Sequence, residues 1–257
     1  MNSDFQDPLS FLQVSAVDVE RWDMEWIRYF RKPEAQTYFR EYNSADPKIR
    51  DVIREFDGKT SPEVFQTPGV ASKKLLLWYN SRDILGKKVA EIGCGVGRVG
   101  RDIAAIVDEY IGLDYSELAL YVAGLVGAPN CRFVSLRNKT ELLKLQSKLD
   151  SVIFRNFFIH QPMENLPWLL ELTYFLLKPS GVATLDFYWP DLEHDRRVEE
   201  GRAVCADQGK QQFPSTLYVF EDENIRQLIN PKFFSLEEDH IMRRPPRRFY
   251  RIMKVGS

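Results

Sequence analysis

The spacing of apolar residues along the chain changes near residue 69. Before this point, residues 8–66 carry aromatic side chains three or four positions apart, as at Trp22 and Trp26. This spacing gives a helix one apolar face, and no run in the region alternates as a strand does. We therefore expect residues 1–69 to form a helical N-terminal cap that serves as a lid over a larger domain.

Helix-start signals divide this cap into three parts. Asp18 has the side chain of a helix N-cap, Pro33 suits a first helical turn, and Asp46-Pro47 combines both features. Three helices are therefore expected before the boundary of the cap. The boundary itself is predicted within residues 60–69, where Thr, Ser, Pro and Gly cluster.

After residue 69, short apolar runs alternate with helical patterns. The strand candidates are residues 87–92, 109–113, 131–135, 151–155 and 181–187. The helices predicted around them span residues 70–80, 97–107, 139–148 and 163–177, with a further helix from a cap at Asp114 or Ser116 to Val126. Strands that alternate with helices of ~10–15 residues indicate a mostly parallel sheet, covered on both faces and joined by right-handed crossovers.

The C-terminal part breaks this alternation. A helix predicted at 222–229 is followed by two strand-like runs, 234–242 and 249–255. The short connection Arg243–Arg248 cannot hold a parallel crossover, so the two runs are expected to form an antiparallel hairpin. We interpret this basic connection as a solvated hairpin tip, with phosphate contact as the alternative. The predicted fold class is α/β: a seven-stranded, doubly wound, Rossmann-like sheet with an antiparallel C-terminal hairpin and a helical N-terminal cap.

Composition and charge limit the partners and the compartment. The chain has 257 residues and a formal net charge of −2, so it has no global field to attract nucleic acid. Its three cysteines, Cys94, Cys131 and Cys205, show no metal-ligand spacing and suit a reducing compartment. Residues 1–7 lack the features of a signal peptide, and no apolar run approaches the ~18 residues of a membrane span. We expect a cytoplasmic protein without a metal, a membrane or a nucleic-acid partner.

The most informative stretch joins the first strand to the helix after it. It reads Glu91-Ile92-Gly93-Cys94-Gly95-Val96-Gly97. Glycines allow positive φ angles and the close approach of a ligand to the backbone, and the following helix presents unpaired N–H groups. The dinucleotide fingerprint of nicotinamide enzymes also fits, at Gly95, Gly97 and Gly100, but it starts three residues beyond the strand. The Glu91 carboxylate favours a cationic ligand over a pyrophosphate, and S-adenosylmethionine carries an ammonium and a sulfonium.

With these residues the chain resembles the class I S-adenosylmethionine-dependent methyltransferases. Besides the glycine motif at 91–97, the run Ile111–Ser116 is similar to the acidic end of the family's second strand. The run Leu176–Gly181 resembles the family's turn before strand five, and the C-terminal hairpin resembles its last two strands. The resemblance covers residues 70–257 and implies a methyltransferase domain there, with S-adenosyl-L-methionine as the cofactor.

The resemblance also implies which residues hold the cofactor. Glu91 and the glycine turn would surround its methionine end, and the Asp114 carboxylate would accept hydrogen bonds from both ribose hydroxyls. The full set implied for cofactor contact is Glu91, Gly93, Cys94, Gly95, Gly97, Arg98, Asp114, Tyr115, Arg155 and Asn156. One position departs from the family, which often has an acidic residue after strand three for the adenine amine, whereas Ser135–Asn138 contains none. Asn138 is one substitute, and backbone contacts are the alternative.

The acceptor side is assigned to the loop after the fourth strand and to an insertion at residues 187–220. In the family this loop faces the transferring methyl group. His160 is therefore the candidate general base, because an imidazole titrates near neutrality; the alternative is a structural role before the next helix. The residues assigned to the acceptor are Phe157, His160, Tyr188 and Trp189.

These assignments predict methyl transfer to an oxygen or nitrogen of a small-molecule acceptor. Direct displacement requires that the two reactants are held close, aligned and dry. The cap and the insertion supply enough aromatic surface to enclose a compact ligand. A protein acceptor is the first alternative, and a non-catalytic binding module that keeps the fold, or a nicotinamide oxidoreductase, are the others.

Overall fold

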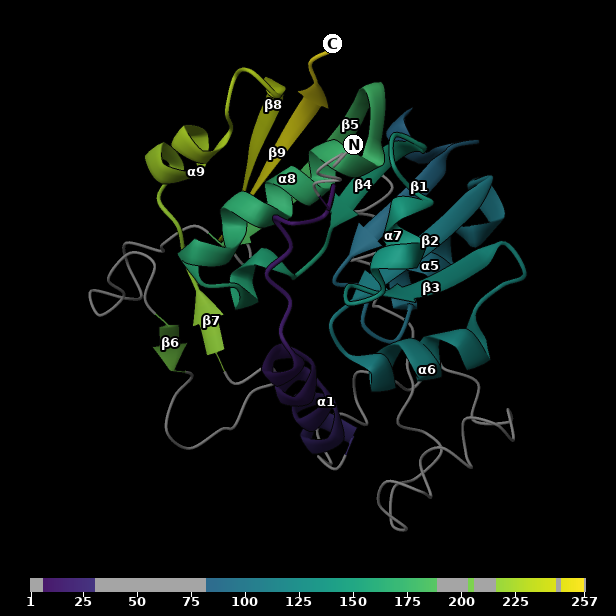
Figure 1. Ribbon diagram of the computed structural model, residues 1–257. Coiled ribbons are helices and arrows are strands. Elements are labelled where there is room, and N and C mark those ends of the chain that lie inside the picture. The colour runs from purple at the N-terminus through teal and green to yellow at the C-terminus, as the bar shows by residue number, and fades with distance from the viewer. Residues whose placement is uncertain (1–6, 31–81, 189–202, 206–215, 244–245, 257) are drawn as a thin grey trace, which may run out of the picture.

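Nine strands build the sheets of the computed structural model, which describes residues 7–30, 82–188, 203–205, 216–243 and 246–256 (Figure 1). Their bounds are β1 Lys88–Ile92, β2 Glu109–Asp114, β3 Cys131–Ser135, β4 Leu149–Phe154, β5 Leu177–Tyr188, β6 Ala203–Cys205, β7 Thr216–Tyr218, β8 Phe234–Arg243 and β9 Pro246–Lys254. Seven of them form one sheet in the order β3-β2-β1-β4-β5-β9-β8, and β6 pairs with β7 separately. The strands from β3 to β5 are parallel, whereas β9 is antiparallel to both β5 and β8. The predicted sheet and its C-terminal hairpin are thus confirmed.

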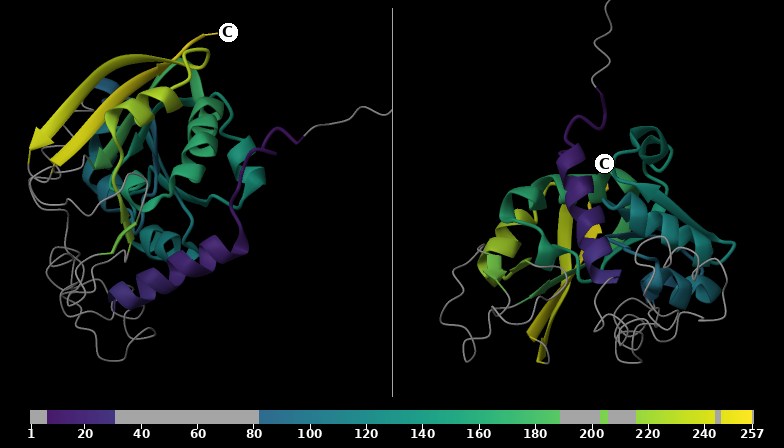
Figure 2. Two further views of the ribbon diagram at one scale, coloured as in Figure 1. Left: turned by 90° about the vertical axis from the view of Figure 1, so that its left-hand side faces the viewer. Right: turned by 90° about the horizontal axis from the view of Figure 1, so that it is seen from below.

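Helices cover both faces of this sheet. The α-helices are α1 Ala16–Phe30, α5 Arg98–Ile103, α6 Glu117–Val126, α7 Lys139–Leu143, α8 Leu166–Leu176 and α9 Asp222–Leu228. Short 3-10 turns are η2 Ala104–Ile106, η3 Phe158–His160 and η4 Met163–Asn165. Seen from below, α1 crosses the end of the sheet (Figure 2). In the described segments, every helix falls short of the length and apolarity that a membrane span requires.

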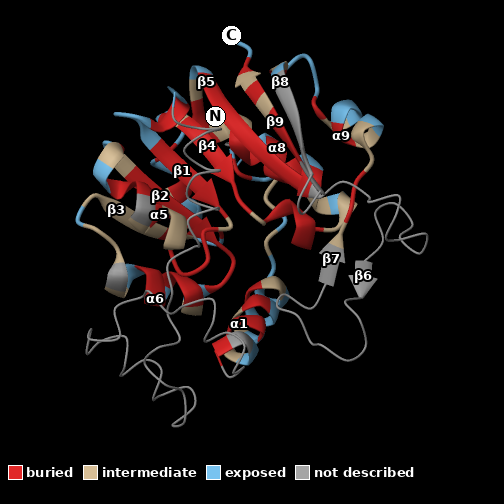
Figure 3. Cartoon of the chain, turned by 180° about the vertical axis from the view of Figure 1, so that it is seen from behind, coloured by how far each residue is buried: buried red, intermediate tan, exposed pale blue. Residues whose placement is uncertain are grey.

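Neighbouring strand residues alternate between two cores. Ala90 and Ile111 join the core that includes α7, α8 and α9. Val89 and Tyr110 face the other way and join the core that includes α5 and α6. The central strands are accordingly buried along their length (Figure 3). Because both faces of these strands are buried, their sequences are continuous apolar runs and do not alternate between apolar and polar residues.

Several element bounds differ from the sequence-based prediction, those of α7 and β5 for reasons that the structure shows. Helix α7 ends at Leu143 instead of continuing to residue 148, because Ser147 adopts a positive φ of 52° and donates its N–H to the Phe175 carbonyl at 2.9 Å. The chain thereby turns into β4. Strand β5 begins at Leu177 rather than at Gly181, since Leu177 already pairs with Leu149 before a register shift.

The start of the first helix also differs. Asp18 was expected at its N-cap, but α1 begins at Ala16 and the cap is formed by Ser15 and Asp18 together. The Asp18 carboxylate accepts from the Ser15 N–H at 2.9 Å, and the Asp18 N–H donates back to Ser15 Oγ at 3.2 Å. This is the reciprocal arrangement of a capping box. The helices predicted at residues 31–80 and the insertion residues 189–202 lie outside the described residues.

The basic connection of the hairpin is shorter than predicted. Strand β9 starts at Pro246, so Arg247 and Arg248 belong to the strand. Arg248 is buried, and its guanidinium lies 3.2 Å from the Asp222 carboxylate of α9. The interpretation of a solvated tip is therefore wrong for Arg248, which instead ties the hairpin to α9.

The two helical glycines Gly100 and Gly124 allow a matched test of how closely α5 packs against Tyr110 of β2. A Cβ on Gly100 of α5 would lie 2.3 Å from the Tyr110 ring, whereas a Cβ on Gly124 of α6 would meet nothing within 4 Å. We expect Gly100→Ala to lower the free energy of unfolding by about 1–3 kcal/mol through overpacking. Gly124→Ala should raise it by about 0.5–1 kcal/mol, as helix propensity alone dictates. Urea denaturation measures both, and equal effects would contradict the close approach at Gly100.

Candidate functional site

A glycine turn joins β1 to α5 at the carboxyl end of the central strand. Gly93, Gly95 and Gly97 have φ angles of 82°, 53° and 72°, in the left-handed region that disfavours side chains. The N–H groups of Gly93 and Cys94 both donate to the Leu113 carbonyl, at 2.7 and 3.2 Å. The turn is therefore fastened to the end of the neighbouring strand β2.

Glu91 stands two residues before the turn and is 2% exposed. Its carboxylate accepts a short hydrogen bond from the Tyr110 hydroxyl of β2. Burial raises the pKa of Glu91 to about 8, although the Tyr110 hydrogen bond and the positive charges of Arg155 and Arg98 act in the opposite direction. Burial likewise raises the pKa of Tyr110. Near neutral pH the Glu91 carboxyl therefore retains a proton, which a cation placed beside it would displace.

The Asp114 carboxylate, at the end of β2, is held by backbone groups on two sides. The Gly95 N–H donates to its Oδ2 at 2.7 Å, and the Ser116 N–H donates to its Oδ1 at 2.9 Å. Burial raises the pKa of Asp114 to about 6, against the lowering effect of these backbone hydrogen bonds. A carboxylate oxygen accepts more than one hydrogen bond, so Asp114 can hold the turn and still bind a hydroxyl.

An aromatic row, consisting of Trp22, Tyr115 and Phe157, lies beside these carboxylates. The Tyr115 ring stacks on Trp22 with centroids 6.4 Å apart and on Phe157 with centroids 5.9 Å apart. All three residues are buried. They come from α1, from the residue after β2 and from the loop after β4, so the row gives the site an apolar wall built from three distant segments.

Aromatic rings also touch the glycine turn directly. A Cβ on Gly93 would lie 2.1 Å from Cδ2 of Phe157, and a Cβ on Gly95 would lie 2.6 Å from Cζ2 of Trp26. Real Cβ atoms do not approach other atoms so closely, so only glycine fits at either position. The faces that the turn leaves bare are thus in contact with Phe157 and Trp26.

The loop after β4 is anchored by a buried acid on β5. Asn156 has a positive φ of 55°, and its N–H donates to Asp186 Oδ2 at 3.1 Å. The Arg155 guanidinium lies 3.5 Å from the same oxygen and 5.2 Å from the Phe249 ring centroid. Asn156 Oδ1 is buried and finds no hydrogen-bond partner among the described residues. Asp186 therefore fixes the uncommon backbone conformation of Asn156, whose buried Oδ1 atom is free to accept a hydrogen bond from a ligand.

His160 ends η3 and is buried against the edge of Trp22, with ring centroids 6.0 Å apart. The next residue, Gln161, accepts hydrogen bonds through Oε1 from the Tyr115 hydroxyl at 3.2 Å and from Asn165 Nδ2 at 3.1 Å. These bonds join the loop after β4 to the aromatic row. His160 is thereby held near the carboxyl ends of the strands.

The structure brings most of the predicted site residues to one end of the sheet. Those that lie near the end of β1, in the turn, at the start of α5, at the end of β2 or in the loop after β4 are Glu91, Gly93, Cys94, Gly95, Gly97, Arg98, Asp114, Tyr115, Arg155, Asn156, Phe157 and His160. Cys94 turns its thiol inward, toward Gly112. Tyr188 ends β5 and pairs with Arg247 across the sheet, and Trp189 lies outside the described residues.

Two further sequence-based expectations concern adenine and metal ions. The Asn138 side chain accepts a hydrogen bond from the Glu141 N–H at 3.1 Å and so serves as the N-cap of α7. This use competes with a role as an adenine ligand. Across the segments that the structure describes, His, Cys, Asp and Glu side chains form no group of three that could hold a metal ion.

The sequence analysis missed several residues of the site. Trp22, Asp23 and Trp26 belong to the predicted cap, and their helical spacing did not reveal which surface they would cover. Asp186 did carry a signal, because it is the acidic residue within the apolar run of β5. Tyr110 had none, since a tyrosine at the start of a buried strand is an ordinary core residue.

Comparisons with known proteins address the family. Residues 89–181 match the family profile described as "Methyltransferase domain". No curated protein sequence matches the chain. A solved structure of a methyltransferase from Methanosarcina mazei is similar with a TM-score of 0.58 and 15% identity, over 70% of this chain and 98% of that one.

Two other solved structures carry names with substrates. Magnesium protoporphyrin IX methyltransferase from Synechocystis PCC 6803, with bound S-adenosylhomocysteine, is similar with a TM-score of 0.54 and 16% identity over 93% of this chain and 99% of that one. A 1,6-didemethyltoxoflavin-N1-methyltransferase from Burkholderia thailandensis reaches a TM-score of 0.52 and 17% identity over 73% of this chain and 78% of that one. At such identities these likenesses establish the fold.

The family profile begins in β1, spans the glycine turn and the acidic end of β2, and ends inside β5. The sheet around this segment has the seven strands and the closing antiparallel hairpin that the sequence predicted. Residues 89–181 match the methyltransferase-domain family, and the chain has the fold of S-adenosylmethionine-dependent methyltransferases.

Proposed function

We propose that S-adenosyl-L-methionine binds at the glycine turn, where the carboxyl ends of β1, β2 and β4 meet. The observation that carries this proposal is the pair of buried carboxylates, Glu91 and Asp114, on either side of a turn that leaves its backbone bare. Open α/β sheets bind ligands where the strand order reverses, and here it reverses between β1 and β4.

The donor set fits this cofactor. Glu91 supplies negative charge for its ammonium group, and the glycine turn, which has no Cβ atoms, allows its methionine end to approach the backbone. Asp114 supplies acceptor oxygens for the ribose hydroxyls. Because the Asn138 side chain caps α7, we assign adenine contact to Tyr115 and to backbone groups.

When bound, the cofactor supplies a sulfonium methyl group that an acceptor oxygen or nitrogen attacks in line. The chain's own contribution is to align the two reactants and to keep water away. Tyr115 and Phe157 of the aromatic row supply the apolar wall for this purpose. We assign to Asn156 Oδ1 a hydrogen bond from the methyl acceptor, and to His160 the role of the base that takes the acceptor's proton.

For the acceptor we propose a small molecule that is methylated on oxygen or nitrogen. The named structural neighbours act on a porphyrin and on a toxoflavin precursor, as their names state. The chain's net charge of −2 gives no long-range attraction for a polyanion. Release of S-adenosylhomocysteine in a screen of small hydroxyl and amine compounds would identify the acceptor. Turnover only with peptides would favour a protein acceptor instead.

A proton-linked affinity is expected if Glu91 contacts the ammonium group. Its pKa of about 8 keeps Glu91 largely protonated near neutrality, and a bound cation favours the ionised form. Binding of S-adenosylhomocysteine should therefore release a proton, and its affinity should rise as the pH increases from about 7 to 8. Titration calorimetry in buffers of different ionisation enthalpy measures the release.

The matched variant is Glu91→Gln, which can still accept the Tyr110 hydrogen bond but has no proton to release. Its affinity should be lower and independent of pH over the same range. Equal proton release by the two proteins would remove Glu91 from the cofactor site.

Asp114→Asn tests the ribose assignment. The amide loses the negative charge and one acceptor oxygen, and hydrogen bonds to charged groups are worth ~1.5–3 kcal/mol each. The affinity for S-adenosylhomocysteine should fall by at least about tenfold. The control is Asp108→Asn, an exposed position just before the opposite end of β2, which should bind normally. An unchanged affinity of Asp114→Asn would place the ribose elsewhere.

His160→Asn and His160→Ala test the general base. A positioned base contributes ~10²–10⁴-fold in rate, so both variants should lose that much turnover with the identified acceptor. Their affinity for S-adenosylhomocysteine should not change. Near-normal turnover of the Asn variant, which cannot take the proton but keeps a polar side chain, would leave His160 with a positioning role only.

A further inference from the structure

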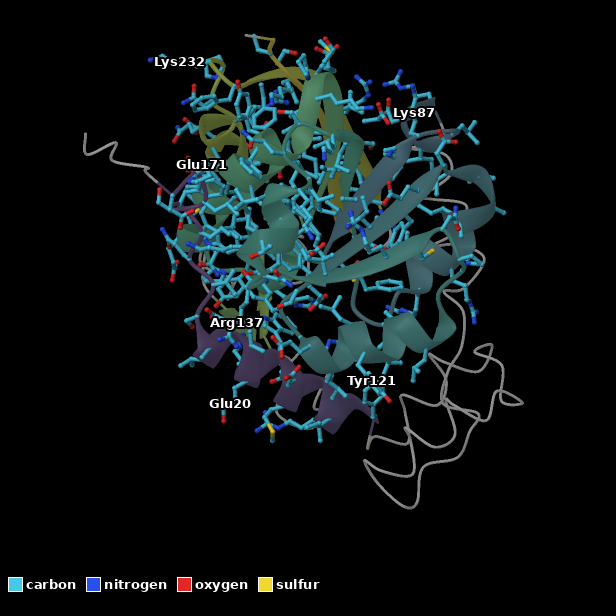
Figure 4. The ribbon with its side chains drawn as sticks, turned by 45° about the vertical axis from the view of Figure 1, so that its right-hand side comes forward. Glu20, Lys87, Tyr121, Arg137, Glu171 and Lys232 are labelled. Atoms are coloured by element: carbon cyan, nitrogen blue, oxygen red, sulfur yellow. The ribbon has the colours of Figure 1, made fainter. Side chains whose placement is uncertain are left out.

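Helix α1 is attached to the domain at the site itself. The Asp23 carboxylate accepts hydrogen bonds through Oδ1 from Ser116 Oγ at 2.6 Å and from the Leu118 N–H at 3.1 Å. Both donors lie at the start of α6, where the helix dipole favours a negative charge. Figure 1 shows α1 beside α6, and Figure 4 shows Glu20 of α1 on the outer side of the molecule. We refer to the Asp23 contact as the α1 latch.

One turn further along α1, Trp26 lies against the glycine turn. Its Cζ2 atom would be only 2.6 Å from a Cβ on Gly95, so the indole edge is in direct contact with the bare face of that glycine. Trp26 is buried, at 8% exposure. A cofactor that approaches the same face of Gly95 would have to occupy the volume of this indole.

Of the two rings on the turn, Trp26 is the one whose support can move as a unit. Phe157 follows β4 directly and contacts the rings of Phe154, Phe158 and Tyr115 within the core. Trp26 instead belongs to a helix that is joined to the domain through side-chain contacts such as the latch. Displacing Trp26 requires a shift of α1, which also moves Trp22 away from Tyr115, whereas displacing Phe157 would disturb the core around Phe154 and Phe158.

We infer that Trp26 is a gating residue: α1 seats its indole in the glycine turn, and the cofactor reaches Gly95 only when the latch opens and α1 moves. This inference rests on the proposed cofactor site. The apparent affinity for the cofactor equals the intrinsic affinity multiplied by the fraction of molecules in which the turn is open. Seating of α1 reduces this fraction. Ligand binding and α1 docking thus oppose each other.

The test compares S-adenosylhomocysteine binding to the full chain and to latch and gate variants, by titration calorimetry and stopped-flow tryptophan fluorescence. Asp23→Ala removes both latch bonds and should raise the affinity and the association rate by at least about tenfold, since even one hydrogen bond to a charged group is worth that factor. Trp26→Ala should act in the same direction. Asp23→Asn keeps an acceptor oxygen and should stay closer to the unaltered protein than Asp23→Ala does.

The control is Met24→Ala, on the exposed side of α1 at 43% exposure, which should bind as the unaltered protein does. Hydrogen exchange gives a second measure: saturating S-adenosylhomocysteine should lower the protection of the α1 amides, and circular dichroism verifies the fold of each variant.

A loss of affinity in Trp26→Ala, or a gain of α1 protection on binding, would make Trp26 a wall of the site and overturn the gate. Failure of every protein, including the unaltered one, to bind S-adenosylhomocysteine would overturn the cofactor site and the gate with it. Normal binding by the unaltered protein with no change in Asp23→Ala would overturn the gate alone.

Discussion

The Asp114 carboxylate connects three parts of the molecule that the chain supplies far apart. One of its oxygens holds the Gly95 N–H and the other holds the Ser116 N–H. Ser116 in turn caps α6 with its hydroxyl oxygen and donates that hydroxyl to Asp23 of α1. A turn of left-handed glycines has no side chains to stabilise it, so its shape depends on backbone bonds of this kind. The turn, the start of α6 and the position of α1 therefore share one support.

The buried carboxyl group of Glu91 lowers the stability of the folded protein at neutral and higher pH. Burial raises the pKa of Glu91 from 4.5 to about 8, which means that the folded protein holds a proton that the unfolded chain has released over that interval. The contribution of Glu91 to stability is thus greatest below its unfolded pKa and is lost as the pH rises through the folded pKa. A neutral, apolar residue would avoid this loss. That β1 ends with a buried acid instead is consistent with a site that must receive a cation.

How much of this could be predicted from the sequence depends on how local each signal is. Some features depend only on residues that are close together in the sequence: the glycine turn, the acid at the end of β2 and the hairpin. All three lie where the sequence predicted them. Helix α7 was predicted too long, because the turn at Ser147 depends on a bond to Phe175 in a distant helix. The aromatic row was not predictable for the same reason. Trp22 and Tyr115 are almost a hundred residues apart in the chain, and helical spacing reports an apolar face without naming the surface that it covers.

The aromatic contacts at the turn also bear on a requirement that every direct methyl transfer shares. The reacting groups must be shielded from water, yet a ligand of the size of the cofactor must first reach a turn that lies at the end of buried strands. An open groove would satisfy access and leave the turn wet, whereas a fixed wall would do the reverse. The proposed gate provides access by movement: when α1 is seated, its apolar face excludes water from the empty turn. After α1 moves, Tyr115 and Phe157 remain beside the turn as its apolar wall. In the proposed gate, the cofactor binds at the ends of strands β1, β2 and β4, and the movement of α1 controls access to them.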